Sequence, residues 1–446
     1  MSHTNKINTH GVVRFITCGS VDDGKSTLIG RLLYDTKAVL TDQIQALSKT
    51  KHARVTASDA AIDLALLTDG LEAEREQGIT IDVAYRYFAT AKRKFIVADA
   101  PGHEQYTRNM VTGASQADVA ILLVDATRID TKLDKINLLA QTKRHAALVK
   151  MLGLKHIAVA VNKIDLLNFD QTVFNRIQEE ILNLAKTLNL PTPQVFPVSA
   201  LLGDNIVFKS KNFQWYDGPT LLEWLENLDI NSQKAGSSLR FPVQYVARQD
   251  GSAALDFRGY LGRVEGGEIH QGQVVTILPS GSSATVSEIY ISNGADSFAQ
   301  DQSVALAKAG DVIALTFTED VDVSRGDMIV SSENPTALLS KQLTADLCWL
   351  DSEALSTSRK YILRHATNTV FVKVKAINQV LDIETLSHAI HADSLGVNMI
   401  GQVELALQKP IVADLFDDSL ATGSFVLIDE VTNHTVAAGM IRRARQ

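Results

Sequence analysis

The chain has 446 residues, 45% of them apolar and 21% charged, which is the composition of a globular protein with about three domains. Its net charge of −8 argues against broad nucleic-acid binding, because that function usually needs a basic face. With only two cysteines, Cys18 and Cys348, and no apolar run of about 20 residues, the chain has neither a disulfide scaffold nor a helical membrane span, so we expect a cytoplasmic protein without membrane contacts.

The first half of the chain alternates short apolar runs with helical periodicity. We expect strands at Val12–Cys18, Phe95–Ala98, Val119–Val124, Ile157–Val161 and Val195–Val198. A run as apolar as Val119–Val124 is typical of a parallel strand that is buried on both faces. Residues Thr172–Leu188 instead carry apolar side chains at helical spacing. This alternation predicts a doubly wound α/β domain with a mostly parallel sheet over residues 1–230.

The second half is rich in short strands and turns. The polar stretch Asn231–Ser238 predicts a linker at residues 231–240, and frequent glycines punctuate the segments that follow. A second boundary lies near Pro335. We therefore expect two small all-β barrel domains, at residues 241–332 and 333–446.

A glycine-rich segment directly follows the first expected strand. Residues 19–26 (GSVDDGKS) fit the pattern G-x-x-x-x-G-K-[ST], and an apolar helix that contains Leu28 and Leu32 comes next. This context indicates a phosphate-binding loop and disfavours a chance glycine-rich turn. Lys25 would reach the β- and γ-phosphates of a nucleotide, and Ser26 would ligate Mg²⁺. The predicted nucleotide contacts here are Gly19, Ser20, Val21, Asp22, Asp23, Gly24, Lys25, Ser26 and Thr27.

The segment Asp99–Gly102 (DAPG) ends the strand expected at Phe95–Ala98. There Asp99 would face Mg²⁺ through a water molecule, and the Gly102 N–H would reach the γ-phosphate, so the residues that follow could respond to hydrolysis. Alone, the pattern D-x-x-G is weak evidence because it is also a common turn. The predicted nucleotide contacts of this segment are Asp99, Ala100, Pro101, Gly102 and His103.

Two single residues complete the predicted catalytic set. Thr80, in Glu74–Ile81 (EREQGITI), could give its hydroxyl to Mg²⁺ and its N–H to the γ-phosphate, which would make this loop a switch; the alternative is an exposed charged helix end. His103 could orient the attacking water or share a proton with it, although a lone histidine is more often structural. We predict Lys25, Thr80 and His103 as catalytic residues, and Ser26, Thr80 and Asp99 as the Mg²⁺ site.

Two motifs predict which base is bound. Asn162–Asp165 (NKID) ends one expected strand, and the Asp165 carboxylate could accept hydrogen bonds from guanine N1–H and the exocyclic amine, which adenine does not offer. Asn162 would brace the pocket, and the stem of Lys163 could cover the base. Ser199–Leu201 (SAL) would supply a backbone N–H to the guanine carbonyl. Alone, NKID could be a helix cap, but the four motifs in this order predict a GTP-binding protein. The contacts added here are Asn162, Lys163, Ile164, Asp165, Ser199, Ala200 and Leu201.

Three segments resemble the translation-factor class of GTPases and, within it, the large subunit of bacterial sulfate adenylyltransferase: Gly19–Thr27, Glu74–Ile81 and Asp99–Thr112. The resemblance runs almost the full length of the chain. It implies a GTPase domain followed by two β-barrels, GTP or GDP and Mg²⁺ as cofactors, and a heterodimer with a small ATP-binding sulfate adenylyltransferase subunit. The implied function is GTP hydrolysis that drives the partner's formation of adenosine 5′-phosphosulfate and pyrophosphate from ATP and sulfate, the first step of assimilatory sulfate reduction.

Two other functions fit the same motifs. An elongation-factor-like GTPase that delivers charged tRNA would have the same three-domain layout, but elongation factors usually carry histidine where this chain has Ser20, and the acidic charge does not favour RNA binding. A regulatory GTPase without linked chemistry is the third possibility. Within the family resemblance, the stretch Arg128–Asn137 looks longer than usual, and Met399 stands where an acidic residue is more usual.

Overall fold

The computed structural model of the chain describes residues 11–38, 64–67, 80–131, 133, 136–230, 238–249, 257–292, 303–333, 337–390 and 393–445. The chain divides into two compact units. One unit comprises Met1–Ile230 with Asp382–Ser387, and the other comprises Asn231–Leu381 with His388–Gln446.

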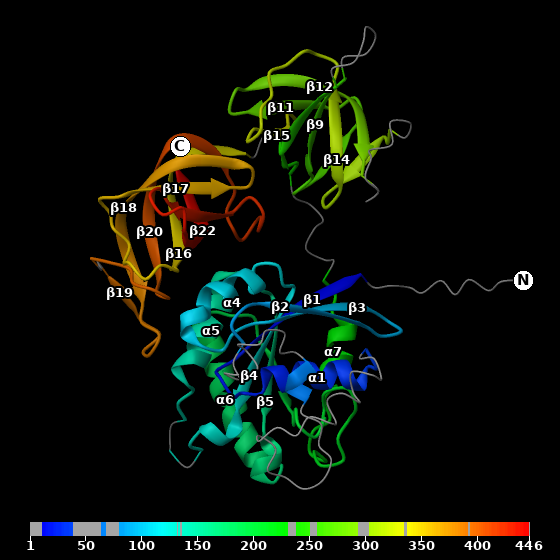
Figure 1. The fold of residues 1–446 in the computed structure, drawn as a ribbon, viewed down its shortest axis with the longest axis vertical. Coiled ribbons are helices and arrows are strands. Elements are labelled where there is room, and N and C mark those ends of the chain that lie inside the picture. Colours follow the sequence, from blue (N-terminus) through cyan, green and yellow to red (C-terminus); the bar gives the residue numbers. More distant parts are fainter. Residues whose placement is uncertain are drawn as a thin grey trace, which may run out of the picture. The chain divides into compact units, whose positions relative to one another are not determined.

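The first unit is built on a six-stranded sheet in the order β2-β3-β1-β4-β5-β6 (Figure 1). The strands are β1 (Val12–Cys18), β2 (Ala84–Ala89), β3 (Lys94–Asp99), β4 (Val119–Asp125), β5 (His156–Asn162) and β6 (Gln194–Pro197). Neighbouring strands are parallel except for β2, which runs antiparallel to β3. The five predicted strands and the mostly parallel sheet are confirmed. The apolar runs did not reveal β2, because this strand buries only Phe88.

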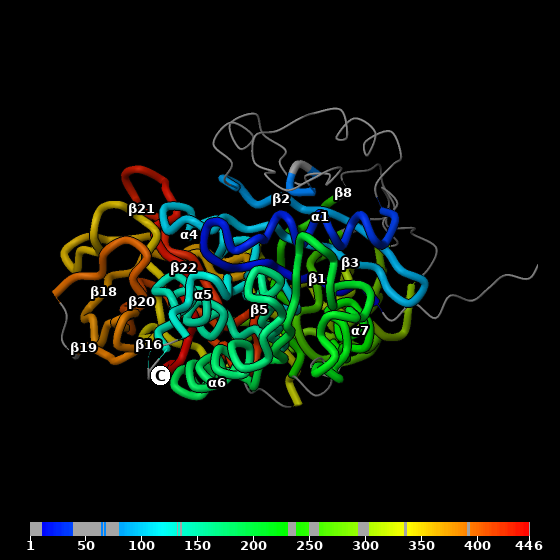
Figure 2. The backbone as a smooth tube through the Cα atoms, turned by 90° about the horizontal axis from the view of Figure 1, so that it is seen from below, coloured from blue at the N-terminus to red at the C-terminus, as the bar shows by residue number. Residues whose placement is uncertain are grey.

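Helices cover both faces of this sheet (Figures 1 and 2). They are α1 (Lys25–Asp35), α4 (Thr107–Ala114), α5 (Ala140–Met151), α6 (Gln171–Thr187) and α7 (Leu221–Asn227), with the short 3-10 helices η1 (Leu64–Leu67), η2 (Glu104–Tyr106), η3 (Ala126–Arg128) and η4 (Ile164–Leu167). Apolar residues of α1 and α7 share one buried cluster with alternate strand residues such as Phe15. The neighbouring Ile16 points to the other face and contacts α4 at Gly113. Because both faces are covered, β4 is buried at every position.

The second unit begins with a seven-stranded antiparallel sheet in the order β7-β15-β11-β12-β14-β9-β8. Its strands, with the small pair β10 and β13, are β7 (Phe241–Pro242), β8 (Tyr245–Gln249), β9 (Phe257–Arg263), β10 (Glu268–His270), β11 (Val274–Leu278), β12 (Ser282–Ile291), β13 (Leu306–Lys308), β14 (Val312–Phe317) and β15 (Met328–Ser331). β7 and β8, which lie at the two ends of this order, are separated only by Val243 and Gln244. The Gln244 N–H donates to the Leu261 carbonyl of β9 at 2.8 Å, which continues the pairing of β8 with β9. The two ends of the sheet therefore meet, and the sheet closes into a barrel.

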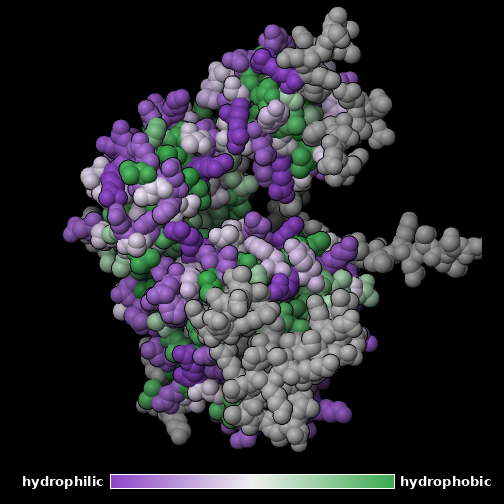
Figure 3. Space-filling model, viewed as in Figure 1, coloured by the Kyte–Doolittle hydropathy of each residue, from purple (hydrophilic) through white to green (hydrophobic). Residues whose placement is uncertain are grey.

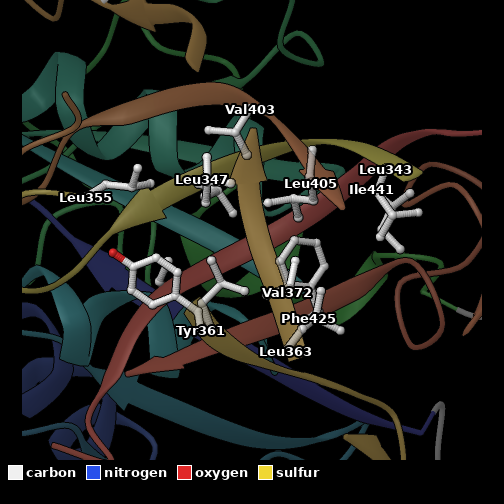
Figure 4. Packing of buried hydrophobic residues seen from close by; sticks show 14 of the residues in the cluster. Leu343, Leu347, Leu355, Tyr361, Leu363, Val372, Val403, Leu405, Phe425 and Ile441 are labelled. Carbon is white, nitrogen blue, oxygen red and sulfur yellow. The ribbon is translucent and has the colours of Figure 1, made fainter. Parts of the chain in front are cut away.

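A second barrel follows. Its strands are β16 (Leu338–Trp349), β17 (Lys360–His365), β18 (Asn368–Leu381), β19 (His388–Ile390), β20 (Ile400–Ala413), β21 (Ser424–Asp429) and β22 (Thr435–Arg445). They are ordered β17-β21-β22-β16-β20-β18-β19, and β17 also pairs with β18, which closes the ring. Alternate residues, including Leu347, Leu405 and Phe425, fill the interior (Figure 4). The prediction of two β-barrels after an α/β domain is confirmed.

A buried ion pair joins the two barrels within the second unit. Arg240 donates from Nε and Nη2 to the two carboxylate oxygens of Asp414, each at 2.8 Å. Thr422 Oγ1 donates to the same carboxylate at 2.5 Å. Because both side chains are mostly buried, removal of either partner would leave a charge without its counterion.

The surface drawn in Figure 3 mixes hydrophilic and hydrophobic residues. In the part of the chain that the structure describes, no helix has both the length and the apolar character needed to cross a membrane.

Candidate active site

The loop between β1 and α1 wraps around the Lys25 side chain. Gly24 ends the loop with a φ of 92°, in the left-handed region, and a Cβ at this position would lie 2.4 Å from the Asn162 amide nitrogen. Glycine is therefore required on both conformational and steric grounds. The buried Lys25 Nζ donates to the carbonyls of Gly19 at 3.1 Å and Ser20 at 2.8 Å. This geometry fits a loop that surrounds phosphate groups.

Burial lowers the pKa of the Lys25 ammonium, and the nearby carboxylates of Asp99 and Asp23 act in the opposite direction by stabilising its charge. A polyphosphate placed beside Nζ would add negative charge where the cation is poorly solvated. The predicted role of Lys25 at the β- and γ-phosphates therefore rests on electrostatics as well as on the motif.

We expect Lys25→Ala to weaken binding of both GDP and GTP by roughly 10–100-fold, because charge-assisted hydrogen bonds to the phosphates are lost. Titration with a fluorescent GDP analogue measures the change. Lys155→Ala, which removes an exposed lysine just before β5, is the matched control and should bind like the wild type. Unchanged GDP and GTP affinity in Lys25→Ala would contradict the assignment.

Ser26 and Asp99 meet beside this loop. The Ser26 hydroxyl donates to one carboxylate oxygen of Asp99 at 3.4 Å, and the Thr17 hydroxyl donates to the other at 3.4 Å. The parallel pairing of β1 with β3 brings Thr17 opposite Asp99. A hydroxyl and a carboxylate are hard oxygen ligands that suit Mg²⁺. The residues present therefore fit a Mg²⁺ ion that also binds nucleotide phosphates.

Gly102 packs directly on the phosphate-binding loop. A Cβ on Gly102 would lie 2.4 Å from Lys25 Nζ and 2.8 Å from the Gly19 carbonyl oxygen, so no side chain fits there. Ala100 and Pro101, between Asp99 and Gly102, are buried. The backbone of the DAPG segment therefore lies where it could contact the phosphate that we predict Lys25 to bind.

His103 lines a cavity of about 390 Å³ beside the loop. The other residues around this cavity are Ser20, Val21, Asp22, Gly102, Glu104, Arg128, Leu139 and Gln141. His103 Nδ1 accepts a hydrogen bond from the Gln105 N–H at 3.3 Å. In the neutral ring this contact assigns the proton to Nε2, which makes that atom a hydrogen-bond donor. A donor at Nε2 can hold a water molecule or a phosphate oxygen.

Thr80 is half-buried, and no hydrogen bond between described residues joins it to the loop or to Asp99. The Asn109 side chain donates to the Ile81 carbonyl at 2.8 Å, which fastens the residue after Thr80 to α4. Residues 74–79 lie outside the described residues. The role of Thr80 in Mg²⁺ binding and catalysis stays a prediction.

Asn162 connects three of the predicted segments. Its Nδ2 donates to the Asp23 carbonyl at 2.8 Å, and its Oδ1 accepts from the Ala200 N–H at 2.9 Å. The phosphate loop, the end of β5 and the SAL segment are therefore held together by one amide. Because the Ala200 N–H is already bonded, a guanine carbonyl would share this donor or take the N–H of the exposed Leu201.

The remaining base-side residues lie at the end of β5. Asp165 is half-buried in the first turn of η4, next to the buried Ile164. Lys163 Nζ lies 2.6 Å from a carboxylate oxygen of Asp125, which is 3% exposed. Asp125 fixes the lysine stem that we predict to cover the base. The sequence motifs did not include Asp125, although a carboxylate that ends the fully apolar strand β4 is a recognisable signal.

Asp23, a residue of the loop itself, is only 1% exposed, and its carboxylate accepts from the Ser20 N–H at 2.5 Å. Burial raises the pKa of this carboxyl to about 6, against the opposing influence of Lys25, the Ser20 N–H and Arg128. Its carbonyl, bonded to Asn162, and its side chain both brace the loop from inside. Asp23 is therefore better placed to shape the loop than to touch phosphate directly.

Comparison with known proteins identifies the family. The Elongation factor Tu GTP binding domain matches residues 10–233, and a GTP-eEF1A C-terminal domain-like region matches residues 342–442. Sulfate adenylyltransferase subunit 1 of Laribacter hongkongensis (strain HLHK9) is 45% identical over 98% of this chain and 86% of its own length. The chain belongs to the sulfate adenylyltransferase subunit 1 family. The corresponding protein of Alteromonas mediterranea is 46% identical over 99% of this chain and 89% of its own length.

One further relative and one solved structure are also similar to this chain. The bifunctional enzyme NodQ of Rhizobium sp. (strain N33) is 47% identical over 96% of the chain and 63% of its own length. Among solved structures, the GTP-bound Ski7 GTPase-like domain of S. cerevisiae covers 97% of this chain and 98% of its own, at 19% identity and a TM-score of 0.51, which shows a shared fold. Because residues 10–233 match a GTP-binding domain, the prediction of guanine nucleotide binding is confirmed. The relatives named sulfate adenylyltransferase subunit 1 favour that family over the elongation-factor alternative.

Proposed function

We propose that this chain is the GTPase subunit of a heteromeric sulfate adenylyltransferase. It hydrolyses GTP, and hydrolysis drives the formation of adenosine 5′-phosphosulfate and pyrophosphate from ATP and sulfate. The observation that carries the proposal is the identity of about 45% to proteins named sulfate adenylyltransferase subunit 1 over nearly the whole chain. The name subunit 1 supports a second subunit, and we assign ATP binding and adenylyl transfer to a small partner in the cytoplasm.

The unfavourable free energy of adenosine 5′-phosphosulfate formation explains why a GTPase would be coupled to this reaction. The anhydride between sulfate and phosphate is a high-energy bond, so its formation from ATP and sulfate is uphill. A subunit whose conformation depends on the γ-phosphate can tie GTP hydrolysis to that step. The close packing of Gly102 on Lys25 supports such a dependence, because a phosphate bound by Lys25 would also lie next to Gly102.

Each site residue has a proposed part in hydrolysis. Lys25 and the loop N–H groups bind and orient the phosphates, while Asp165 selects guanine. Ser26, Thr80 and Asp99 would hold Mg²⁺, which neutralises phosphate charge when bound. His103 uses its Nε2–H to hold the attacking water or a phosphate oxygen in position.

The coupling has a direct test. We expect the chain, mixed with its small partner, ATP and sulfate, to raise adenosine 5′-phosphosulfate above the equilibrium level only when GTP is present. A non-hydrolysable GTP analogue should give no increase, because a ligand that is not consumed cannot move the equilibrium of a catalysed reaction. The assay follows product at equilibrium with GTP, with the analogue and with neither.

One control and two contrary outcomes complete this assay. The chain without its partner should hydrolyse GTP slowly and form no adenosine 5′-phosphosulfate. Equal product with GTP, analogue and neither would refute the coupling. Binding of charged tRNA by the GTP-bound chain would support the elongation-factor alternative instead.

A further inference from the structure

Arg128 contacts the phosphate-binding loop from a part of the sequence that carries no recognised motif. It is the last residue of η3, and its Nη1 donates to the Val21 carbonyl at 3.0 Å. The same nitrogen lies 3.7 Å from a carboxylate oxygen of Asp23. The Arg128 guanidinium is therefore held beside Val21, the third residue of the loop, although Arg128 is far from Lys25 in the sequence.

Arg128 also lines the cavity that contains His103 and Gly102. Its side chain is 45% exposed, so the guanidinium is not enclosed by its contacts with the loop. Gly102, His103 and Arg128 thus border one space. Because Lys25 Nζ lies directly beside Gly102, the γ-phosphate of the proposed substrate would lie in this space. Arginine suits this place because its planar group keeps its charge and can contact two phosphoryl oxygens at once.

We infer that Arg128 is a catalytic arginine, supplied by the chain to its own active site, that stabilises the phosphoryl group during GTP hydrolysis. This inference rests on the GTPase reaction proposed above. In that reaction the water oxygen forms a bond to the γ-phosphorus as the bond to the bridging oxygen breaks. The electron pair of the broken bond stays on GDP, and the proton of the water passes to inorganic phosphate or solvent. Arg128 transfers no proton; its charge opposes the negative charge that develops on the transferred group and the bridging oxygen.

A purely structural role for Arg128 makes different predictions. The Asp23 carboxylate is buried, and its Oδ1 has no hydrogen-bond partner among the described residues. If the sole role of Arg128 is to balance the charge of Asp23, it should stabilise the empty, GDP-bound and GTP-bound loop equally. A catalytic arginine instead acts mainly in the transition state, so its loss should spare GDP binding.

The test compares wild type, Arg128→Ala and Arg128→Lys in the full chain, with and without the partner subunit. Single-turnover GTP hydrolysis, GDP affinity, and affinity for GDP with aluminium fluoride, which mimics the transferred phosphoryl group, are measured. We expect Arg128→Ala to slow hydrolysis by roughly 10²-fold or more and to lose the aluminium fluoride complex, with GDP affinity nearly unchanged. Arg128→Lys should recover only part of the rate, because an ammonium cannot make the paired contact. Arg263→Ala, which removes an exposed arginine of β9, is the matched control.

A double variant separates catalysis from charge balance. Asp23→Asn removes the negative charge beside Arg128 and keeps an oxygen that can accept from the Ser20 N–H. If Arg128 is catalytic, Arg128→Ala with Asp23→Asn stays slow. Recovery of the wild-type rate in the double variant would overturn the inference, as would a normal rate in Arg128→Ala or an equal loss of GDP and aluminium fluoride binding. A wild-type complex that does not hydrolyse GTP would overturn both this inference and the proposed function.

Discussion

Asp165→Asn should change the nucleotide preference of the chain from guanine to xanthine. The carboxylate is expected to accept two hydrogen bonds from guanine, and an asparagine replaces one acceptor with a donor. Guanine then loses one partner and meets a repulsive contact, whereas xanthine offers a carbonyl at that position. Because sites built on such hydrogen bonds discriminate strongly, GTP affinity should fall by ~10²-fold or more.

Competition binding with GTP, XTP and ATP measures this preference. Asp217→Asn, at an exposed position of the same unit, is the matched control and should keep the wild-type order of affinities. A wild-type GTP preference in Asp165→Asn would remove Asp165 from the base pocket. A loss of all three nucleotides together would point to a local folding defect in η4 rather than to base recognition.

His103→Ala should slow GTP hydrolysis by roughly 10²-fold or more while GTP and GDP binding stay nearly intact, because we predict that this residue acts on the attacking water and not on the base or the α- and β-phosphates. The cavity around His103 leaves room for a water molecule next to Gly102. Single-turnover hydrolysis with the partner present, together with GDP affinity, gives both quantities.

His434→Ala is the matched control for this change, since it removes an exposed histidine from the turn before β22. It should hydrolyse GTP at the wild-type rate. If His103→Ala also does so, His103 is structural, and its contact with the Gln105 N–H as the N-cap of η2 is its main role.

Local patterns in the sequence were enough to predict much of this architecture. A run such as VAILLV in β4 is buried on both sides and can hardly be anything but a central strand. The phosphate loop was predictable because the fold admits only glycine at some of its positions. At Gly24, for example, φ is in the left-handed region and a Cβ would lie 2.4 Å from the Asn162 amide nitrogen. Strand β2 was harder to find, because an edge strand with one buried side chain has neither a continuous apolar run nor clean alternation.

The supporting residues of the site could not be predicted in the same way. Asp125 fixes Lys163 and Arg128 contacts Val21, but these partners are 38 and 107 positions apart in the sequence and are joined only by the folded sheet. Gln141 is a further example, since it donates to the Gly102 carbonyl at 3.2 Å from the first turn of α5. No spacing rule relates such pairs, because the distance between strand ends depends on the order of strands in the sheet and not on their order in the chain.

The single amide of Asn162 has a thermodynamic consequence for nucleotide binding. It bonds the phosphate loop through Asp23 and the base segment through Ala200, so neither region can rearrange without affecting the other. We therefore expect guanine and polyphosphate to be recognised jointly, because a ligand that stabilises one of these two segments also stabilises the other through Asn162. Such coupling is reciprocal, with one free energy shared by both halves of the ligand. Free polyphosphate and free guanosine should therefore each bind this site with less favourable free energy than the same group contributes as part of GTP.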